Sequence, residues 1–188
     1  KDFPGIKAEC NEDAVMIVAP SDHFIENEDK FLAYVQEAFE YCLKSDVLMT
    51  LGIEPSEPNT GYGYIQFEAE GGDVKKVLDF TEKPDLENAQ KFLERGDYLW
   101  NAGIFIWSVR SILKAFGSNL PSMYDLLRKG SGAWNSDRER SFIEENYASS
   151  ENISIDYGIM EKAENVYVMA TEFGWNDLGT WGSLYNKL

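Results

Sequence analysis

The sequence predicts an α/β fold with a parallel sheet, and three observations support this prediction. Residues 15–19 (VMIVA) and 47–53 (VLMTLGI) are apolar runs without polar alternation, which is typical of strands covered on both faces. Between them, apolar residues recur at helical spacing from Phe31 to Cys42. A strand, a helix and a second strand in this order favour a right-handed crossover with parallel pairing.

The first helix has clear end signals. Asn27 is a suitable N-cap, Glu28 and Asp29 place negative charge in the first turn, and we expect the helix to end near Lys44. After the second strand, residues 54–64 (EPSEPNTGYGY) are too rich in Pro and Gly for regular structure. The tyrosines of this segment predict an ordered, functional loop rather than a linker.

The remaining chain alternates strands and helices within a single domain, residues 1–188. Residues 64–80 indicate two strands joined at Gly71-Gly72, and Gly96 is a natural stop for the helix that follows them. The apolar strand 99–109 is interrupted by Asn101 and Gly103. The other expected elements are a helix capped by Ser108, helices over 123–128, 137–147 and 155–162, a strand over 166–170 and a final helix from about Thr180.

Composition excludes several functional classes. The chain has 17 Lys and Arg against 33 Asp and Glu, a net charge of −16, so its surface should repel nucleic acids and anionic membranes. It contains no run of roughly 20 apolar residues of the kind that spans a bilayer, and its start does not resemble a signal peptide. Cys10, Cys42 and the single histidine His23 have no zinc-site spacing. We therefore expect a cytoplasmic protein.

Two acidic residues suggest a divalent-metal site. Asp22 follows directly after the first buried strand, and α/β sheets bind ligands just beyond the carboxyl ends of their strands. Asp177 lies in GWNDLGTW, whose tryptophans indicate an ordered loop. One or two carboxylates plus substrate phosphates suffice for Mg²⁺. The alternative is that both are ordinary loop acids, and sequence spacing alone does not bring them together.

Further candidates lie in three other segments. Glu82 and Lys83 in FTEKPD could bind sugar hydroxyls and a phosphate, respectively; the alternative is a surface ion pair worth about 0.5 kcal/mol. Gly63 could let backbone amides approach a ligand, or form a bare turn. Asn101, in an apolar strand, either bridges backbone groups or contacts a ligand. Without a recognisable nucleophile, His23 is better interpreted as a structural hydrogen-bonding residue than as a base.

The order of the motifs is more specific than any one of them. APSDH, TGYGYI, FTEKP, YLWNAGIFIW, SIDYGIMEKA and WNDLGTW follow one another along the chain, and this succession closely resembles the bacterial mannose-1-phosphate guanylyltransferase family of sugar-phosphate nucleotidyltransferases. The resemblance extends from about Asp13 to Tyr185. It implies a three-layer, Rossmann-like (GT-A-like) fold with a mixed, mostly parallel central sheet.

The resemblance also implies roles for individual residues. The magnesium ligands would be Asp22 and Asp177. Lys83 would face the sugar phosphate, and the other sugar contacts would be Gly63, Glu82, Asn101 and Asp156. Many relatives have Ser where this chain has Ala102, a small change that should not abolish binding.

The implied reaction is that of GTP with mannose 1-phosphate, giving GDP-mannose and pyrophosphate with Mg²⁺. A phosphate oxygen of the sugar attacks the α-phosphorus in line, so no covalent enzyme intermediate is needed. The implied partners are these two small molecules and a possible second copy in a homodimer. Two alternatives stay open: a nucleotidyltransferase for glucose 1-phosphate with dTTP or UTP, and a non-catalytic regulatory homologue that binds nucleotide sugars.

One departure from the family lies at the start of the chain. Family members open with a basic, glycine-rich loop that binds the nucleotide triphosphate, and no such loop precedes APSDH here. Without its amides and positive charges, GTP binding should be severely weakened. We therefore expect an incomplete nucleotidyltransferase domain that lacks its N-terminal nucleotide-binding part and the C-terminal β-helix, and that is inactive by itself.

Overall fold

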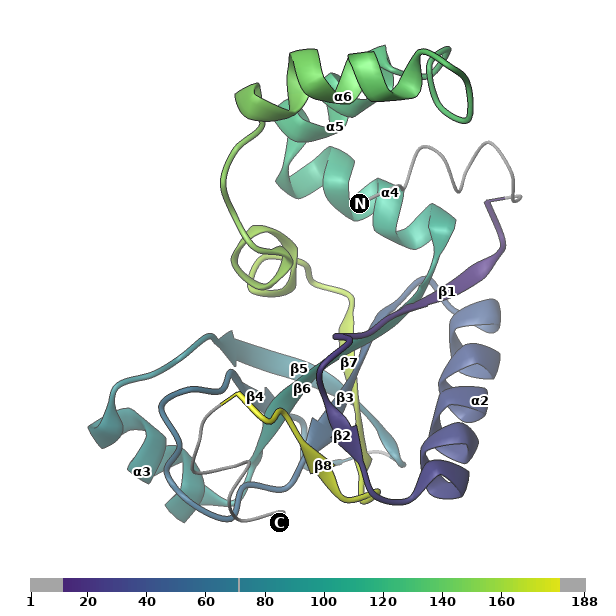
Figure 1. Ribbon diagram of the computed structural model, residues 1–188. Coiled ribbons are helices and arrows are strands. Elements are labelled where there is room, and N and C mark those ends of the chain that lie inside the picture. Colours follow the sequence, from purple (N-terminus) through teal and green to yellow (C-terminus); the bar gives the residue numbers. More distant parts are fainter. Residues whose placement is uncertain (1–11, 71, 180–188) are drawn as a thin grey trace.

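The computed structural model describes residues 12–70 and 72–179 of the chain, and Figure 1 shows their arrangement. The strands are β1 (Val15–Val18), β2 (Phe24–Ile25), β3 (Leu48–Ile53), β4 (Tyr64–Phe67), β5 (Val74–Thr81), β6 (Tyr98–Ser108), β7 (Val166–Thr171) and β8 (Trp175–Asn176). The helices are α2 (Glu28–Lys44), α3 (Leu86–Arg95), α4 (Val109–Asn119), α5 (Pro121–Lys129) and α6 (Glu139–Asn146), with the short turns η1 (Tyr147–Ser149) and η2 (Asp156–Met160).

Helices cover both faces of the main sheet, so the expected three layers are confirmed. On one face, Ala38 and Cys42 of α2 pack against side chains of β3 and β6 such as Met49 and Ile106. On the other face, α4 and η2 cover Leu48, Trp107 and their neighbours. Figure 1 shows α2 along one flank and α4, α5 and α6 together beyond one end of the sheet. No helix of the described residues is long and apolar enough to cross a membrane.

The sheet is mixed, as expected, but it is not mostly parallel. Its strand order is β1-β6-β3-β7-β5-β4, and β4 also pairs with β6. Among the described strands only β3 and β7 pair in parallel, whereas the other pairings are antiparallel. The crossover prediction was wrong about neighbours, because β6 lies between β1 and β3 and runs antiparallel to both.

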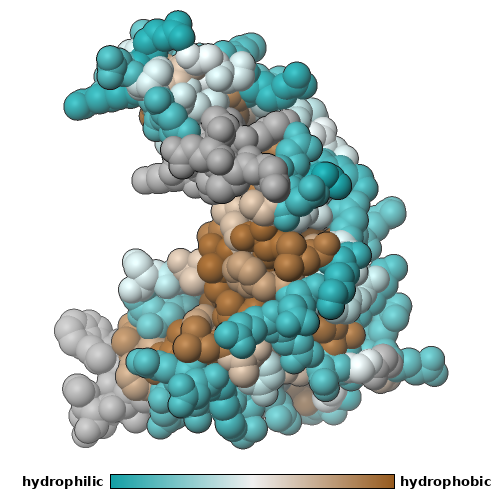
Figure 2. Space-filling view, turned by 90° about the vertical axis from the view of Figure 1, so that its right-hand side faces the viewer, coloured by the Kyte–Doolittle hydropathy of each residue, from teal (hydrophilic) through white to brown (hydrophobic). Residues whose placement is uncertain are grey.

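The first strand is also less buried than its sequence predicts. β1 pairs only with β6 in the described part of the chain, and Ile17 and Val18 are each 37% exposed. Among the described residues, this apolar run therefore forms an edge strand. Helices α4, α5 and α6 together are called the helical layer below. Figure 2 shows a broad apolar area in the hollow below this layer, on the side of the molecule that faces the viewer.

Local signals predicted most other elements correctly. Asn27 caps α2 through Lys30 N–H, Gly96 ends α3 in the left-handed conformation, and Ser108 caps α4 through Ser111 N–H. The hairpin β4–β5 forms with antiparallel register from Tyr64 opposite Thr81. The helix expected from Thr180 lies outside the described residues.

Candidate functional site

Four of the sequence-predicted residues meet at one place beside the sheet. Asn101 in the middle of β6 donates from its backbone N–H to the carbonyl of Gly63 (2.8 Å), and its side-chain Nδ2 donates to Oδ1 of Asp156 (3.1 Å). Glu82, at the end of β5, lies against the same glycine. Gly63, Glu82, Asn101 and Asp156 therefore form one group, which we call the carboxylate cluster.

Gly63 lies in close contact with side chains of the carboxylate cluster. A Cβ atom at this position would lie 2.5 Å from Oε2 of Glu82 and 3.4 Å from Cβ of Asn101. No side chain fits between them without displacing the carboxylate. The close contact of Gly63 is thus with side chains of the protein, and the approach of its backbone amide to a ligand stays a prediction.

Lys83 lies at the rim of the carboxylate cluster. Its Nζ is 3.4 Å from Oε1 of Glu82, and the lysine side chain is 61% exposed while that of Glu82 is 12% exposed. The pair predicted from sequence is thus present, with its acidic member partly buried and its basic member exposed to solvent. The exposed ammonium can reach a phosphate group outside the cluster.

The environment of both carboxyl groups disfavours their charged forms. The pKa of Glu82 is raised, first by burial and then by the negative charge of Asp156. The pKa of Asp156 is raised by burial, which outweighs the hydrogen bond from Asn101 and the charge of Lys83. Partly buried carboxylates can be stabilised by polyhydroxylated ligands, whose O–H groups donate to them.

Asp22 and Asp177 are brought together by an element that the sequence did not predict. β2 and β8 form a two-stranded antiparallel ribbon in which Phe24 pairs with Asn176 and Ile25 with Trp175. Both acids lie just beyond this pairing, on the same side of it. Both also act on His23 through their negative charges. The structure thus supplies the proximity that sequence spacing could not.

Aromatic residues hold this second group, which we call the aspartate pair. The Tyr62 hydroxyl donates to Oδ1 of Asp177 (3.0 Å), and the Tyr62 ring packs edge-on against Trp100 and Trp175. The phenol's pKa is raised by burial and by this hydrogen bond to Asp177. Because Tyr62 immediately precedes Gly63, the same loop reaches both the aspartate pair and the carboxylate cluster.

His23 has a structural partner. Its Nδ1 accepts a hydrogen bond from Nε1 of Trp175 (3.1 Å), which leaves Nε2 as the protonated nitrogen of the neutral ring. Burial lowers the pKa of His23 despite the charges of Asp22 and Asp177. These contacts support the interpretation of His23 as a structural residue rather than a base.

The donor chemistry of the aspartate pair fits Mg²⁺. In the described part of the chain no group of three or more His, Cys, Asp or Glu side chains could hold a metal ion. Magnesium, however, is commonly held by one or two carboxylates together with water and substrate phosphates. Gly179 leaves room for this ligation, since a Cβ there would lie 2.7 Å from Oδ2 of Asp177.

Unusual backbone conformations occur beside both groups. Among described residues other than glycine, positive φ angles are found at Lys83 (48°), Asn135 (56°) and Leu178 (52°). Lys83 follows Glu82, and Leu178 follows Asp177. Such conformations cost of order 1–3 kcal/mol and cluster at functional sites; two of the three lie beside the two groups, and the third, Asn135, lies in the loop before α6.

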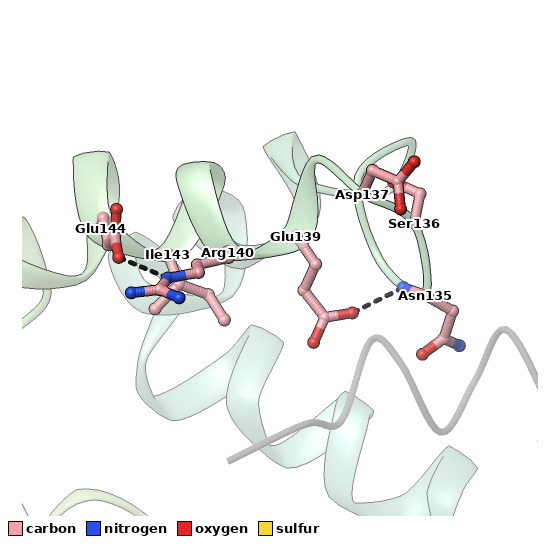
Figure 3. A pocket seen from close by; sticks show the side chains of 7 residues that line it. All are labelled: Asn135, Ser136, Asp137, Glu139, Arg140, Ile143 and Glu144. Carbon is pink, nitrogen blue, oxygen red and sulfur yellow. Dashed lines mark hydrogen bonds and ion pairs between the residues drawn. The ribbon is translucent and has the colours of Figure 1, made fainter.

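The helical layer offers a contrasting surface. Figure 3 shows a depression lined by residues of α6 and the loop before it. There Arg140 donates to Glu144 (2.8 Å), and the Asn135 N–H donates to Glu139 (2.6 Å). The polar groups pair locally instead of converging on a common centre, so this depression is a weaker candidate than the carboxylate cluster.

Sequence reasoning missed two residues that hold the site. Thr50 donates a hydrogen bond to Asn101, and Tyr62 donates one to Asp177. The available signals were Thr50 as the single hydroxyl in the strand LMTLGI and the tyrosines of the loop. Neither signal identifies the hydrogen-bond partner, because both partners are distant in the sequence.

Comparisons with known proteins agree on one class. The family model described as "Nucleotidyl transferase" matches residues 5–188. The chain is 37% identical over 182 residues to a mannose-1-phosphate guanylyltransferase of Sinorhizobium fredii, covering 94% of this chain and 35% of that protein. It is 36% identical over 181 residues to the enzyme of that name from Escherichia coli K12, covering 92% and 37%. The chain therefore spans little more than a third of these curated relatives.

Solved structures agree on the fold. A crystal structure from Thermus thermophilus, described as a mannose-1-phosphate geranyltransferase, matches with a TM-score of 0.86 and 30% identity over 98% of this chain and 52% of that one. A Helicobacter pylori structure described as a mannose-6-phosphate isomerase matches with a TM-score of 0.76 and 24% identity, covering 93% of this chain and 68% of that chain. At that identity the second likeness shows the fold alone.

Proposed function

The chain belongs to the nucleotidyl transferase family, and we propose that it forms the sugar and metal side of a mannose-1-phosphate guanylyltransferase. The reaction would join GTP and mannose 1-phosphate to give GDP-mannose and pyrophosphate. Similarity to proteins of that name from two bacteria supports this choice of substrates. GTP and mannose 1-phosphate are thus the proposed partners, and Mg²⁺ the proposed cofactor.

A single observation carries the proposal: one loop joins a group suited to sugar hydroxyls to a group suited to a metal-bound phosphate. Tyr62 contacts Asp177, while the next residue, Gly63, contacts Glu82 and Asn101. A sugar 1-phosphate needs both chemistries within the length of one small molecule. Glu82 and Asp156 would accept hydrogen bonds from mannose hydroxyls, and Nδ2 of Asn101 would donate one.

The protein's part in the reaction is alignment and charge neutralisation. Lys83 would leave Glu82 to bind the phosphate of mannose 1-phosphate, so that one phosphate oxygen points at the α-phosphorus of GTP. The new bond forms between that oxygen and the α-phosphorus, while the bond from the α-phosphorus to the bridging oxygen of pyrophosphate breaks. Holding two reactants in line in this way can lower the activation free energy by about 7–11 kcal/mol.

Mg²⁺ would be held by the carboxylates of Asp22 and Asp177. When bound, the ion neutralises the phosphate charges that develop in the reaction. Tyr62 would orient Asp177 for this role by donating to Oδ1, which leaves Oδ2 for the ion.

The test is turnover by the full-length gene product that carries this sequence. With Mg²⁺, GTP and mannose 1-phosphate, ³¹P NMR should show GDP-mannose and pyrophosphate appearing in equal amounts. Turnover of neither substrate would contradict the proposal and favour a regulatory homologue. A clear preference for glucose 1-phosphate with dTTP or UTP would instead assign the protein to another sugar nucleotidyltransferase.

Two further parts of the proposal concern setting and assembly. We propose a cytoplasmic location, because the described cysteine, Cys42, is a buried free thiol, as in reducing compartments. A homodimer stays a prediction that analytical ultracentrifugation would check. The net charge of −16 argues against a nucleic-acid partner.

A further inference from the structure

Thr50 is a buried polar residue at the centre of the sheet. It lies in the middle of β3 and is 0% exposed. Its Oγ1 is 3.0 Å from Oδ1 of Asn101 and 3.2 Å from the carbonyl oxygen of Ile104. Both neighbours are acceptors, so the single proton of the Thr50 hydroxyl is shared between them, with the shorter distance to Oδ1 of Asn101. A buried hydroxyl is costly without such partners, and this one points directly at a residue of the carboxylate cluster.

The opposing strand is irregular at the same place. Thr50 pairs with Phe105 and Gly52 with Asn101, so three residues of β6 (102–104) face the single residue Leu51 of β3. Gly103 in this bulge has φ of +67°, a conformation that glycine adopts without strain. Bulges of this kind redirect side chains beside active sites.

The bulge and Thr50 together fix the orientation of the Asn101 amide. The Gly103 N–H donates to the same Oδ1 atom (3.0 Å) that receives the Thr50 hydroxyl. If the amide were flipped, its NH₂ group would face the Gly103 N–H, which cannot accept a hydrogen bond. Nδ2 therefore faces Asp156, where it donates to Oδ1 (3.1 Å).

This orientation sets the hydrogen-bonding character of the cluster. Glu82 and Asp156 present acceptors, and one N–H of Asn101 is already used by Asp156. The second N–H is then a neutral donor for a ligand hydroxyl oxygen. With the amide reversed, an oxygen would face the carboxylate of Asp156 and that donor would be lost.

We propose that Thr50 is a positioning residue of the sugar subsite: its hydroxyl, together with the Gly103 N–H, holds the Asn101 amide with Nδ2 toward Asp156 and the ligand. The inference rests on the proposed sugar-phosphate function for its ligand, and on the hydrogen bonds alone for the orientation of the amide. Thr50 itself would touch no substrate.

The test compares two buried threonines in the full-length gene product. Thr50→Val keeps the shape and removes the hydroxyl. Thr171→Val is the matched control, because Thr171 is also buried and its hydroxyl donates to a backbone carbonyl, that of Gly52 (3.0 Å), and not to a side chain of the cluster. Thr50→Ser restores the donor.

We expect Thr50→Val to raise the Kd for mannose 1-phosphate about tenfold, the size of one lost hydrogen bond, and to shift the Asn101 side-chain amide signals in ¹H–¹⁵N NMR spectra. Its kcat should change less than twofold. Thr171→Val and Thr50→Ser should bind within about twofold of the wild type. Should the valine variant fail to fold, Thr50→Ala removes the hydroxyl without placing a methyl group against Oδ1.

Three outcomes would overturn the inference: unchanged Asn101 signals and Kd in Thr50→Val, equal weakening in Thr171→Val, or no restoration by Thr50→Ser. Failure of the wild type to bind mannose 1-phosphate would count against the proposed function instead. In that case the Asn101 signals still decide whether Thr50 positions the amide.

Discussion

The carboxylate cluster and the aspartate pair are built in different ways. Asn101 of the cluster lies on the inner strand β6 and is hydrogen-bonded to Gly63, Gly103 and Asp156. The aspartate pair depends on a ribbon of only two residue pairs and on the Tyr62 hydrogen bond. The difference indicates that the carboxylate cluster is fixed by the core of the fold, whereas the aspartate pair is assembled by contacts between segments distant in the sequence.

The largest effect should come from removing the aspartate pair. We expect Asp22→Asn with Asp177→Asn to lower the rate of GDP-mannose formation on the order of 10³-fold, because charge stabilisation in the transition state is lost. Titration of the rate with Mg²⁺ should also show a higher midpoint. The control is Asp125→Asn with Asp137→Asn, two exposed acids of the helical layer. Unchanged Mg²⁺ affinity in the test variant would refute the paired-metal assignment.

Substitutions at two glycines should affect the carboxylate cluster and the aspartate pair independently. Gly63→Ala places a Cβ 2.5 Å from Oε2 of Glu82, and Gly179→Ala places one 2.7 Å from Oδ2 of Asp177. We expect the first to raise the Kd for mannose 1-phosphate, and the second the Mg²⁺ midpoint, each about tenfold. Gly72→Ala is the control, since a Cβ there meets nothing within 4 Å. If both variants affected the same ligand, the division into two groups would be wrong.

A smaller effect is expected at the connection between the groups. Tyr62→Phe removes the donor to Asp177 and keeps the ring against Trp100 and Trp175. The Mg²⁺ midpoint should rise between two- and tenfold, in line with about 0.5–1.5 kcal/mol for one hydrogen bond, while calorimetry should give an unchanged Kd for mannose 1-phosphate. Tyr64→Phe, which removes only a 3.4 Å contact to the Glu57 carbonyl, is the control. Loss of sugar affinity in Tyr62→Phe would contradict this assignment.

The smallest effect concerns pH and stability. The pKa of Glu82 is raised above its ordinary value of 4.5, first by burial. The folded state therefore binds the proton more tightly than the unfolded state, so this group's contribution to stability is present below pH 4.5 and is lost as pH rises through the folded pKa. Glu82→Gln should accordingly raise Tm more at pH 7 than at pH 4. The same exchange at exposed Glu70 is the control, and equal Tm changes at both pH values for Glu82→Gln would contradict the sign.

The sequence predicted which strands and helices form better than it predicted which of them lie side by side. Caps such as Asn27 and Ser108 are local, so the helix starts they mark were recovered. The apolar run of β1 indicated a strand but not its place at the edge, because exposure depends on which strands lie beside it. Likewise β6 lies between β1 and β3 although it is far from both in sequence.

The same limit applies to the site. Most candidate residues were proposed from their local sequence context and Asp156 from the family resemblance, and the structure brings them into two groups. The ribbon that joins Asp22 to Asp177 involves only two pairs of residues, distant from each other in the sequence, too short a pairing for any pattern to predict. The role of Thr50 could not be predicted for a related reason, since its hydrogen-bond partner Asn101 is 51 residues away in the sequence.

A crystal structure of the full-length gene product with GDP-mannose and Mg²⁺ tests the central claim most directly. The account predicts mannose hydroxyls on Glu82, Asp156 and Nδ2 of Asn101, with Mg²⁺ between the carboxylates of Asp22 and Asp177. Mannose bound elsewhere, or an ion held without either aspartate, would contradict it.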